Sequence, residues 1–255
     1  MTMKNWLKCM IIGVALGMIV SGNASGGEPG PAVNELPAIF HKNARVLFQG
    51  DSITDGGRDY KAHYLDHALG HGYPYIIAAN AGGHFPELNL TFLNRGISGN
   101  KVSDLAARWQ NDAIALKPDV LSILIGVNDV WHNLGAKKEI KFDEIEATYD
   151  KMLTDSRTAF PGTKIVLCEP FILRGSANTG QWAEWDAAIK KIQQMVARLG
   201  EKHKFPVVHF QRVFDEAVKR AAAEYWLFDG VHPAWAGHQI MADEWLRAVN
   251  EYWPR

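Results

Sequence analysis

Ser52, Asp229 and His232 are residues of the types that together turn a serine hydroxyl into a nucleophile. The hydroxyl reacts after a base takes its proton, and the base needs a carboxylate that fixes its tautomer and stabilises its charged form. Asp229 and His232 are separated by two residues, so one loop can present both. Ser52 ends the turn Gly50-Asp51-Ser52, which by itself is more typical of a plain turn or a helix N-cap. We predict that Ser52 is the nucleophile, His232 its base and Asp229 the orienting acid.

Acyl transfer at Ser52 also requires hydrogen-bond donors for the oxyanion that forms on the attacked carbonyl. Gly99 can offer an unobstructed backbone N–H, and Asn128 can offer a side-chain amide. The backbone N–H of Ser52 would complete a set of three. Taken singly, Gly99 reads as a turn glycine and Asn128 as an Asx turn. Together with Ser52 they are predicted to form an oxyanion hole.

Short apolar runs alternate with longer stretches of helical spacing along the rest of the chain. The runs predict strands at Val46–Phe48, Leu90–Leu93, Val120–Ile125, Ile165–Cys168 and Val207–Phe210. The stretches between them predict helices over Val102–Leu116, Phe142–Phe160, Trp182–Leu199 and about Ala234–Tyr252. This alternation favours a mostly parallel sheet covered on both faces, a three-layer α/β/α domain. In such a domain the ligand crevice lies at the carboxyl ends of the strands.

The N-terminus has the pattern of a secretory signal peptide over residues 1–24. Lys4 and Lys8 precede the apolar run Cys9–Val20, and small residues follow it. An uncleaved membrane anchor is the alternative. Residues 25–35 are predicted to be a linker and residues 36–255 a single domain. The expected location is therefore secreted or periplasmic.

The composition, 47% hydrophobic and 22% charged residues, is that of an ordinary globular protein. Without Lys4 and Lys8, 25 basic residues stand against 28 acidic ones. This balance does not favour nucleic acid or an anionic membrane as a partner. Cys168 would be the only cysteine left after signal removal, so no intramolecular disulfide is expected.

Four other histidines invite a different reading of the site. His63, His67 and His71 are spaced four apart, as in a metal site on one helix face. Glycines interrupt that helix and no carboxylate stands in register, so a polar loop without metal is predicted. His238, early in the last helix, is predicted to make a structural hydrogen bond, with a second catalytic histidine as the alternative.

Four blocks of the sequence resemble, in order, those of the SGNH hydrolase superfamily, also called GDSL-type lipases and esterases. They are Gly50-Asp51-Ser52-Ile53-Thr54, the single glycine Gly99, Gly126-Val127-Asn128-Asp129 and Asp229-Gly230-Val231-His232-Pro233. The resemblance covers nearly all of the mature sequence. It implies a flavodoxin-like α/β/α fold with a five-stranded parallel sheet in the order 2-1-3-4-5, the triad and oxyanion hole given above, and no cofactor.

Further segments resemble the bacterial acetylxylan esterases, which remove acetyl groups from plant-polysaccharide fragments. They are Thr54–Arg58, Arg95–Asn100, Asp104–Trp109 and Asn128–Trp131. This resemblance implies an acetylated oligosaccharide or polysaccharide as the substrate and makes a homo-oligomer plausible. A broad lysophospholipase or thioesterase, and an inactive carbohydrate-binding protein, remain as alternatives.

Three side chains near these blocks are candidate substrate contacts. Trp131 and Trp226 offer aromatic faces for a sugar, although each can equally be packed in the interior. Arg58 is a candidate either for substrate binding or, like Asp129, for bracing the loops. The segment Asp59–Leu69 has no counterpart in the resemblance and is predicted to shape the rim of the site.

Overall fold

The computed structural model describes residues 37–62 and 65–254. The predicted signal peptide and linker lie outside the described residues, and so does His63. Within the described part no helix has both the length and the apolar character needed to cross a membrane.

Five strands form one parallel sheet with the order β2-β1-β3-β4-β5, which confirms the predicted fold. The strands are β1 (Arg45–Gly50), β2 (Thr91–Asn94), β3 (Val120–Leu124), β4 (Lys164–Cys168) and β5 (Val207–Val208). The chain moves outward from β1 to β2 and then returns to the other side of β1 as β3. Loops leaving the carboxyl ends of β1 and β3 therefore diverge at this point, which is where open α/β sheets form their crevice.

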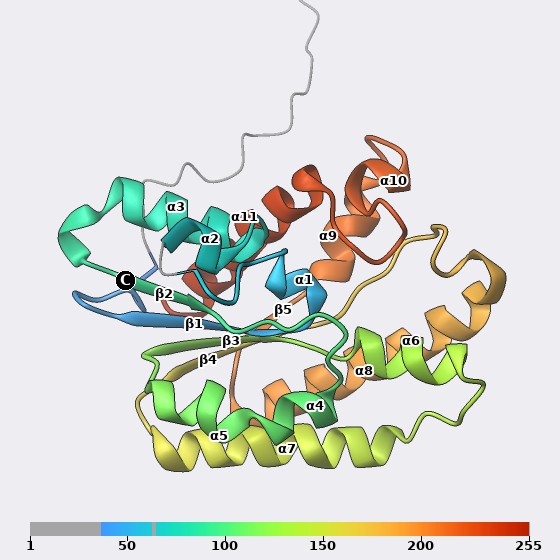
Figure 1. Ribbon diagram of the computed structural model, residues 1–255, viewed down its shortest axis with the longest axis horizontal. Helices are drawn as coiled ribbons and strands as arrows, with labels where there is room; N and C mark the ends of the chain where they lie inside the picture. Colours follow the sequence, from blue (N-terminus) through green and yellow to red (C-terminus); the bar gives the residue numbers. More distant parts are fainter. Residues whose placement is uncertain (1–36, 63–64, 255) are drawn as a thin grey trace, which may run out of the picture. The chain divides into compact units, whose positions relative to one another are not determined.

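Helices cover both faces of the sheet (Figure 1). One layer contains α2 (Leu65–Leu69), α3 (Tyr73–His84), α9 (Phe210–Ala217), α10 (Ala223–Trp226) and α11 (Trp235–Tyr252). The other contains α4 (Val102–Ala107), α5 (Trp109–Asp112), α6 (Val127–Gly135), α7 (Phe142–Ala159) and α8 (Trp182–His203). Single 3-10 turns stand at Pro86–Leu88, Ile114–Leu116 and Thr179–Gln181, and the short α1 (Ser52–Asp55) follows β1 directly.

Trp245, in α11, joins one helix layer to the sheet. Its ring is fully buried and packs against Phe48 of β1 and Phe40, at centroid distances of 5.7 and 6.2 Å. Its indole N–H donates to the Ser122 hydroxyl on β3 at 2.9 Å, so the one polar atom of the ring is satisfied. The helix that follows the Asp229–His232 loop is thereby fixed to two interior strands.

Two predicted elements differ from the structure. The helix predicted over Val102–Leu116 is broken into α4, α5 and a 3-10 turn, because the backbone leaves helical geometry at Arg108 (φ −108°, ψ 4°), whose guanidinium bonds to loop carbonyls. The strand predicted over Val207–Phe210 keeps only its first two residues. It pairs with β4 alone, and the chain turns at His209 to start α9.

Helix α3 was not predicted. Its sequence, YPYIIAANAGGH, has no one-sided apolar pattern, because apolar and small residues occur all round it. It packs against α11 in the layer shown at the top of Figure 1.

Candidate active site

Ser52 is the first residue of α1, at the tight turn that leaves β1. Asp51 caps this helix, since its Oδ1 accepts the Ile53 N–H at 3.0 Å. A Cβ at Gly50 would collide with the Leu124 carbonyl and the Thr54 side chain, so only glycine fits before the turn. The sequence thus places Ser52 at the carboxyl end of the sheet with its side chain partly exposed.

The structure brings Ser52, His232 and Asp229 into one hydrogen-bonded chain. The Ser52 hydroxyl lies 3.0 Å from His232 Nε2, and His232 Nδ1 lies 2.7 Å from Asp229 Oδ2. The second oxygen, Asp229 Oδ1, accepts the backbone N–H groups of Val231 and His232 at 2.8 and 2.7 Å. One short loop therefore wraps around the carboxylate and holds the imidazole against it.

The loop after β4 holds this Asp-His loop in place. Leu173 donates its N–H to Gly230 O at 2.9 Å, and Ala177 donates its N–H to Asp229 O at 3.0 Å. Gly230 has φ +93°, and a side chain there would also collide with the Leu173 carbonyl. The glycine between the acid and the base is thus required by both backbone conformation and space.

The contact between His232 and Asp229 shifts the pKa values of the two groups in opposite directions. The hydrogen bond to Asp229 raises the pKa of His232, and this outweighs burial, which acts in the opposite direction. Burial acts to raise the pKa of Asp229, but hydrogen bonds from His232 and from the loop N–H groups bring it below its ordinary value. With an ionised carboxylate at Nδ1, the neutral imidazole carries its proton on Nδ1. Its Nε2 lone pair then faces the serine hydroxyl.

Asp51 is a second carboxyl group beside the nucleophile. It is 1% exposed, and burial raises its pKa to about 7. Oδ1 caps α1, whereas Oδ2 has no hydrogen-bond partner among the described residues. Its charge adds a smaller upward contribution to the pKa of His232 than the contact with Asp229 does.

The three predicted oxyanion donors follow the carboxyl ends of β1, β2 and β3: Ser52 lies in α1, Gly99 in a loop and Asn128 in α6. Within the described residues no acceptor takes the backbone N–H of Ser52 or Gly99. Gly99 has φ +82°, with open space where a Cβ would stand. Asn128 Nδ2 donates to Asn100 O at 3.1 Å, which uses one of its two hydrogens. The role of these groups at the oxyanion stays a prediction.

The aromatic residues near His232 differ in how much of each ring is open to a ligand. Trp131 lies beside the imidazole, 5.7 Å between centroids, and meets Trp185 of α8 edge-on. Trp226 is 5% exposed and its indole N–H donates to Ala221 O, so little of this ring is open to a ligand. Phe228 is 60% exposed and stacks on His232 at 5.7 Å.

Arg58 and Asp129 both bind loops. Arg58 is 8% exposed, donates its Nε to Gly96 O at 3.0 Å and lies over the Tyr60 ring at 4.1 Å. Its guanidinium is therefore used to join the loops after β1 and β2, which corresponds to the bracing alternative. Asp129 Oδ2 accepts the Val102 N–H at 3.0 Å and joins α6 to α4.

Two further braces were missed by the sequence reading. Asp55 Oδ2 accepts hydrogen bonds from the hydroxyls of Ser98 and Tyr60 at 2.8 and 2.7 Å. Arg108 donates to Arg95 O at 2.8 Å and to Gly50 O at 3.2 Å. The sequence offered one signal for Arg108, since it is a charged residue next to the apolar face of a predicted helix.

The segment Asp59–Leu69, predicted to shape the rim, begins and ends at a narrow neck. Side chains on Gly56 or Gly70 would collide with backbone atoms of the other side, and both residues have positive φ, +55° and +73°. The neck is closed by a hydrogen bond of 2.9 Å from His71 N–H to Gly56 O, and beyond it Asp59 N–H donates to His67 O at 2.9 Å.

Asn94, at the end of β2, is the polar group that ties this region to the sheet, and we expect its replacement by alanine to destabilise the fold. It is 2% exposed, donates Nδ2 to Thr54 O and Leu69 O at 2.6 and 2.8 Å, and accepts the Gly96 N–H at 2.9 Å. Asn94→Ala leaves these buried groups unpaired and should lower the free energy of unfolding by about 2–4 kcal/mol. Urea denaturation measures this.

The matched control is Asn111→Ala, at an exposed position of α5, which should change the free energy by less than about 0.5 kcal/mol. Equal urea midpoints for the two variants would show that Asn94 does not hold the loops.

His238 and Cys168 have structural surroundings. His238 Nδ1 accepts the Tyr73 N–H at 3.2 Å, and burial lowers its pKa to about 4. Burial raises the pKa of Cys168 to about 12, so its thiol is not poised to react. Among residues 37–62 and 65–254 no group of three or more His, Cys, Asp or Glu side chains is placed to hold a metal ion.

Comparison with known proteins identifies the family. Residues 48–240 match the model of the GDSL-like lipase/acylhydrolase family. An acetylxylan esterase of Geobacillus stearothermophilus is 36% identical over 216 residues, which cover 83% of this chain and 96% of the relative.

Two crystal structures are similar in fold as well as in sequence. A protein of Parabacteroides merdae ATCC 43184, provisionally assigned as a GDSL-like lipase, is 41% identical, has a TM-score of 0.79 and covers 83% of this chain and 97% of its own. The acetylxylan esterase Axe2 of G. stearothermophilus is 35% identical, has a TM-score of 0.74 and covers 85% of this chain and 98% of its own. The chain belongs to the GDSL-like lipase/acylhydrolase family, the SGNH hydrolases, and is a carboxylic ester hydrolase.

Proposed function

We propose that this protein is a serine esterase that removes acetyl groups from O-acetylated xylan and its oligosaccharides. The observation that carries the chemistry is the hydrogen-bonded chain from Ser52 through His232 to Asp229, with links of 3.0 and 2.7 Å. The choice of substrate is supported by the acetylxylan esterase that shares 36% of its residues over most of both chains.

In the proposed reaction, His232 Nε2 takes the proton of the Ser52 hydroxyl as the oxygen attacks the acetyl carbonyl. The oxyanion accepts hydrogen bonds from the N–H groups of Ser52 and Gly99 and from Asn128. The imidazolium, stabilised by Asp229, then protonates the leaving sugar oxygen, and an acetyl-serine remains. Water attacks this ester with His232 again as base, which releases acetate and restores Ser52.

An extracytoplasmic location would bring the enzyme to a polysaccharide substrate. We propose secretion or export to the periplasm on the strength of the signal-like sequence at residues 1–24. Self-association remains an expectation from the family resemblance.

Acetate release from a panel of acetylated polysaccharides tests the substrate. We expect acetylxylan to be the best of a set that includes acetylated glucomannan and acetylated pectin. A parallel series of nitrophenyl esters should show the highest kcat/KM for acetate and a steep fall with chain length. Preference for long acyl chains would instead support a lysophospholipase or thioesterase. Saccharide binding without acetate release would support an inactive binding protein.

A further inference from the structure

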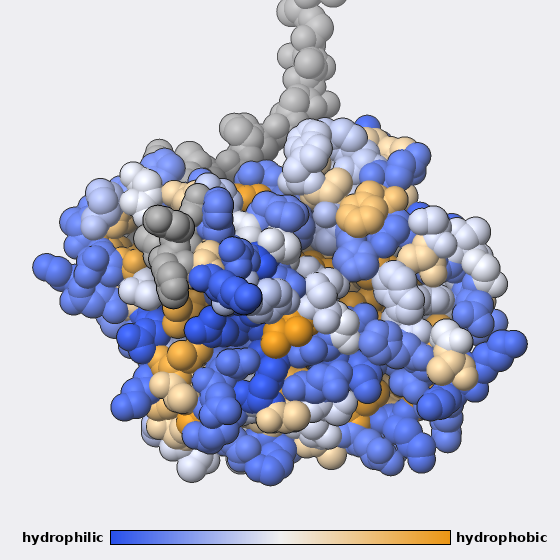
Figure 2. Space-filling model, in the orientation of Figure 1, coloured by the Kyte–Doolittle hydropathy of each residue, from blue (hydrophilic) through white to orange (hydrophobic). Residues whose placement is uncertain are grey.

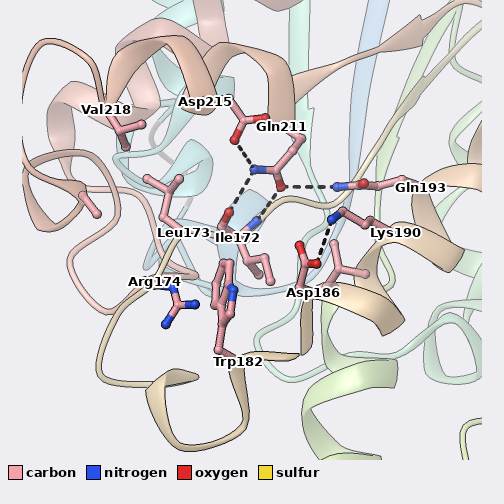
Figure 3. Close-up of a pocket in the computed structure, with 12 residues that line it drawn as sticks. Ile172, Leu173, Arg174, Trp182, Asp186, Lys190, Gln193, Gln211, Asp215 and Val218 are labelled. Atoms are coloured by element: carbon pink, nitrogen blue, oxygen red, sulfur yellow. Dashed lines mark hydrogen bonds and ion pairs between the residues drawn. The ribbon is translucent and has the colours of Figure 1, made fainter. Parts of the chain in front are cut away.

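A cavity lies beside the loop after β4 (Figure 3). Its volume is about 420 Å³, and it lies between α8 and α9. The side chains that define it are Ile172, Leu173, Trp182, Asp186, Gln211 and Asp215. None of these residues belongs to the triad or to the predicted oxyanion hole.

The cavity combines an aromatic wall with a fixed polar wall. Trp182 is partly exposed, and the Arg174 guanidinium lies 4.9 Å from its ring centre. Opposite, Gln211 Nε2 donates to Ile172 O at 3.0 Å and to Asp215 at 2.9 Å, which sets the direction of the amide. A sugar presents an apolar C–H face and a rim of hydroxyls, so it matches one wall of each kind.

The charges of the cavity favour a neutral ligand. Two cationic side chains, Arg174 and Lys190, line it together with two carboxylates, Asp186 and Asp215. Lys190 and Asp186 also pair with one another at 2.7 Å. A phosphate or another anion would meet the carboxylates as well as the cations, whereas an uncharged saccharide can hydrogen-bond to both.

Leu173 connects the cavity to the loop that carries Asp229 and His232. Leu173 lines the cavity while its N–H donates to Gly230 O at 2.9 Å, in the loop that carries the acid and the base. On the other side, α8 bears Trp182 in the cavity and, one turn later, Trp185 against Trp131, which contacts His232. The loop after β4 therefore has the cavity on one side and the loop that carries the acid and the base on the other.

We propose that this cavity is a distal saccharide subsite, which holds an unmodified sugar unit of the chain whose acetyl group is presented to Ser52. The proposal rests on the proposed function for the identity of the polymer. It predicts that Trp182 contributes to the use of long substrates more than of short ones, because a small ester does not reach the cavity.

The test compares Trp182→Ala with Trp182→Phe and with the wild type. Trp182→Ala should lower kcat/KM on acetylxylan about tenfold more than on nitrophenyl acetate, mainly through KM, and Trp182→Phe should restore most of the loss. Trp253→Ala, a partly buried tryptophan at the end of α11, is the matched control and should affect both substrates equally. Equal losses on polymer and small ester for Trp182→Ala would overturn the subsite.

A binding measurement separates this proposal from the proposed function. Titration calorimetry with unacetylated xylohexaose uses the full-length protein and needs no ester hydrolysis. Binding that weakens about tenfold in Trp182→Ala and not in Trp253→Ala supports the subsite, even if the wild type fails to release acetate from xylan. Binding that is absent from the wild type, or the same in both variants, overturns it.

Discussion

Ser52→Ala is expected to lower kcat/KM for nitrophenyl acetate by about 10⁴–10⁶-fold. The variant removes the oxygen that forms the acyl-enzyme, while the oxyanion donors and His232 stay in place. The Ser52 hydroxyl makes its one hydrogen bond within the described residues to His232 Nε2. Stability should therefore change little, and thermal unfolding of the variant can show that a loss of rate is not a loss of fold.

The control for this prediction is Ser103→Ala, at an exposed position in α4, which should keep the wild-type rate. Where deacylation limits turnover, a burst of nitrophenol equal to the enzyme concentration is expected with the wild type and is absent with Ser52→Ala. Hydrolysis by Ser52→Ala near the wild-type rate would mean that another group attacks the ester.

Asp229→Asn is expected to cost about 10⁴-fold in kcat. The carboxylate accepts from His232 Nδ1 at 2.7 Å and also holds two loop N–H groups through its other oxygen. An amide in its place can donate to Nδ1, which would leave the proton of the neutral imidazole on Nε2. That tautomer cannot take a proton from the serine.

The same variant should change the pH profile in a defined direction. In the wild type, contact with Asp229 raises the pKa of His232 above 6.5, and activity is lost as the pH falls through that raised pKa. Removing the negative charge lowers the pKa, so the acid limb of kcat/KM should move to lower pH. Asp155→Asn, which breaks a surface pair with Lys151, should leave the limb in place. A limb at the same pH in Asp229→Asn would contradict the assignment.

The alternation of apolar runs and amphipathic stretches was enough to predict the architecture. Strands of a covered parallel sheet are buried on both faces, so β1, β3 and β4 read as continuous apolar runs. The edge strand β5 is too short for its pattern to be separated from the start of α9. The order of the strands came from the family resemblance and not from the apolar pattern.

The residues of the site were predictable where their spacing is local, and less so where their contacts are distant. Asp229 and His232 are neighbours on one loop, so their pairing could be inferred directly. The bonds donated by Arg108 to Gly50 O and by the Ser98 hydroxyl to Asp55 join residues more than 40 positions apart. No local pattern encodes them.

Trp226 and Phe228 are two positions apart, and the sequence did not predict which of the two rings is buried. Trp226 ends α10 and is 5% exposed, whereas Phe228 lies in the loop beyond the helix and is 60% exposed. The boundary between the helix and the loop falls between the two rings, and the sequence alone does not reveal it.

Because the two ends of the Asp59–Leu69 segment meet at Gly56 and Gly70, this segment can change in sequence independently of the rest of the domain. Because its ends are clasped by backbone atoms, a change of length or composition beyond the clasp need not move Ser52, and the entropic cost of a longer loop grows only slowly with its length. The sequence of this rim segment can then change while the catalytic triad keeps its geometry. Grafting rim segments of other esterases between Tyr60 and Gly70, so that Arg58 and Tyr60 keep their contacts with Gly96 and Asp55, is the corresponding route to an enzyme with a new preference.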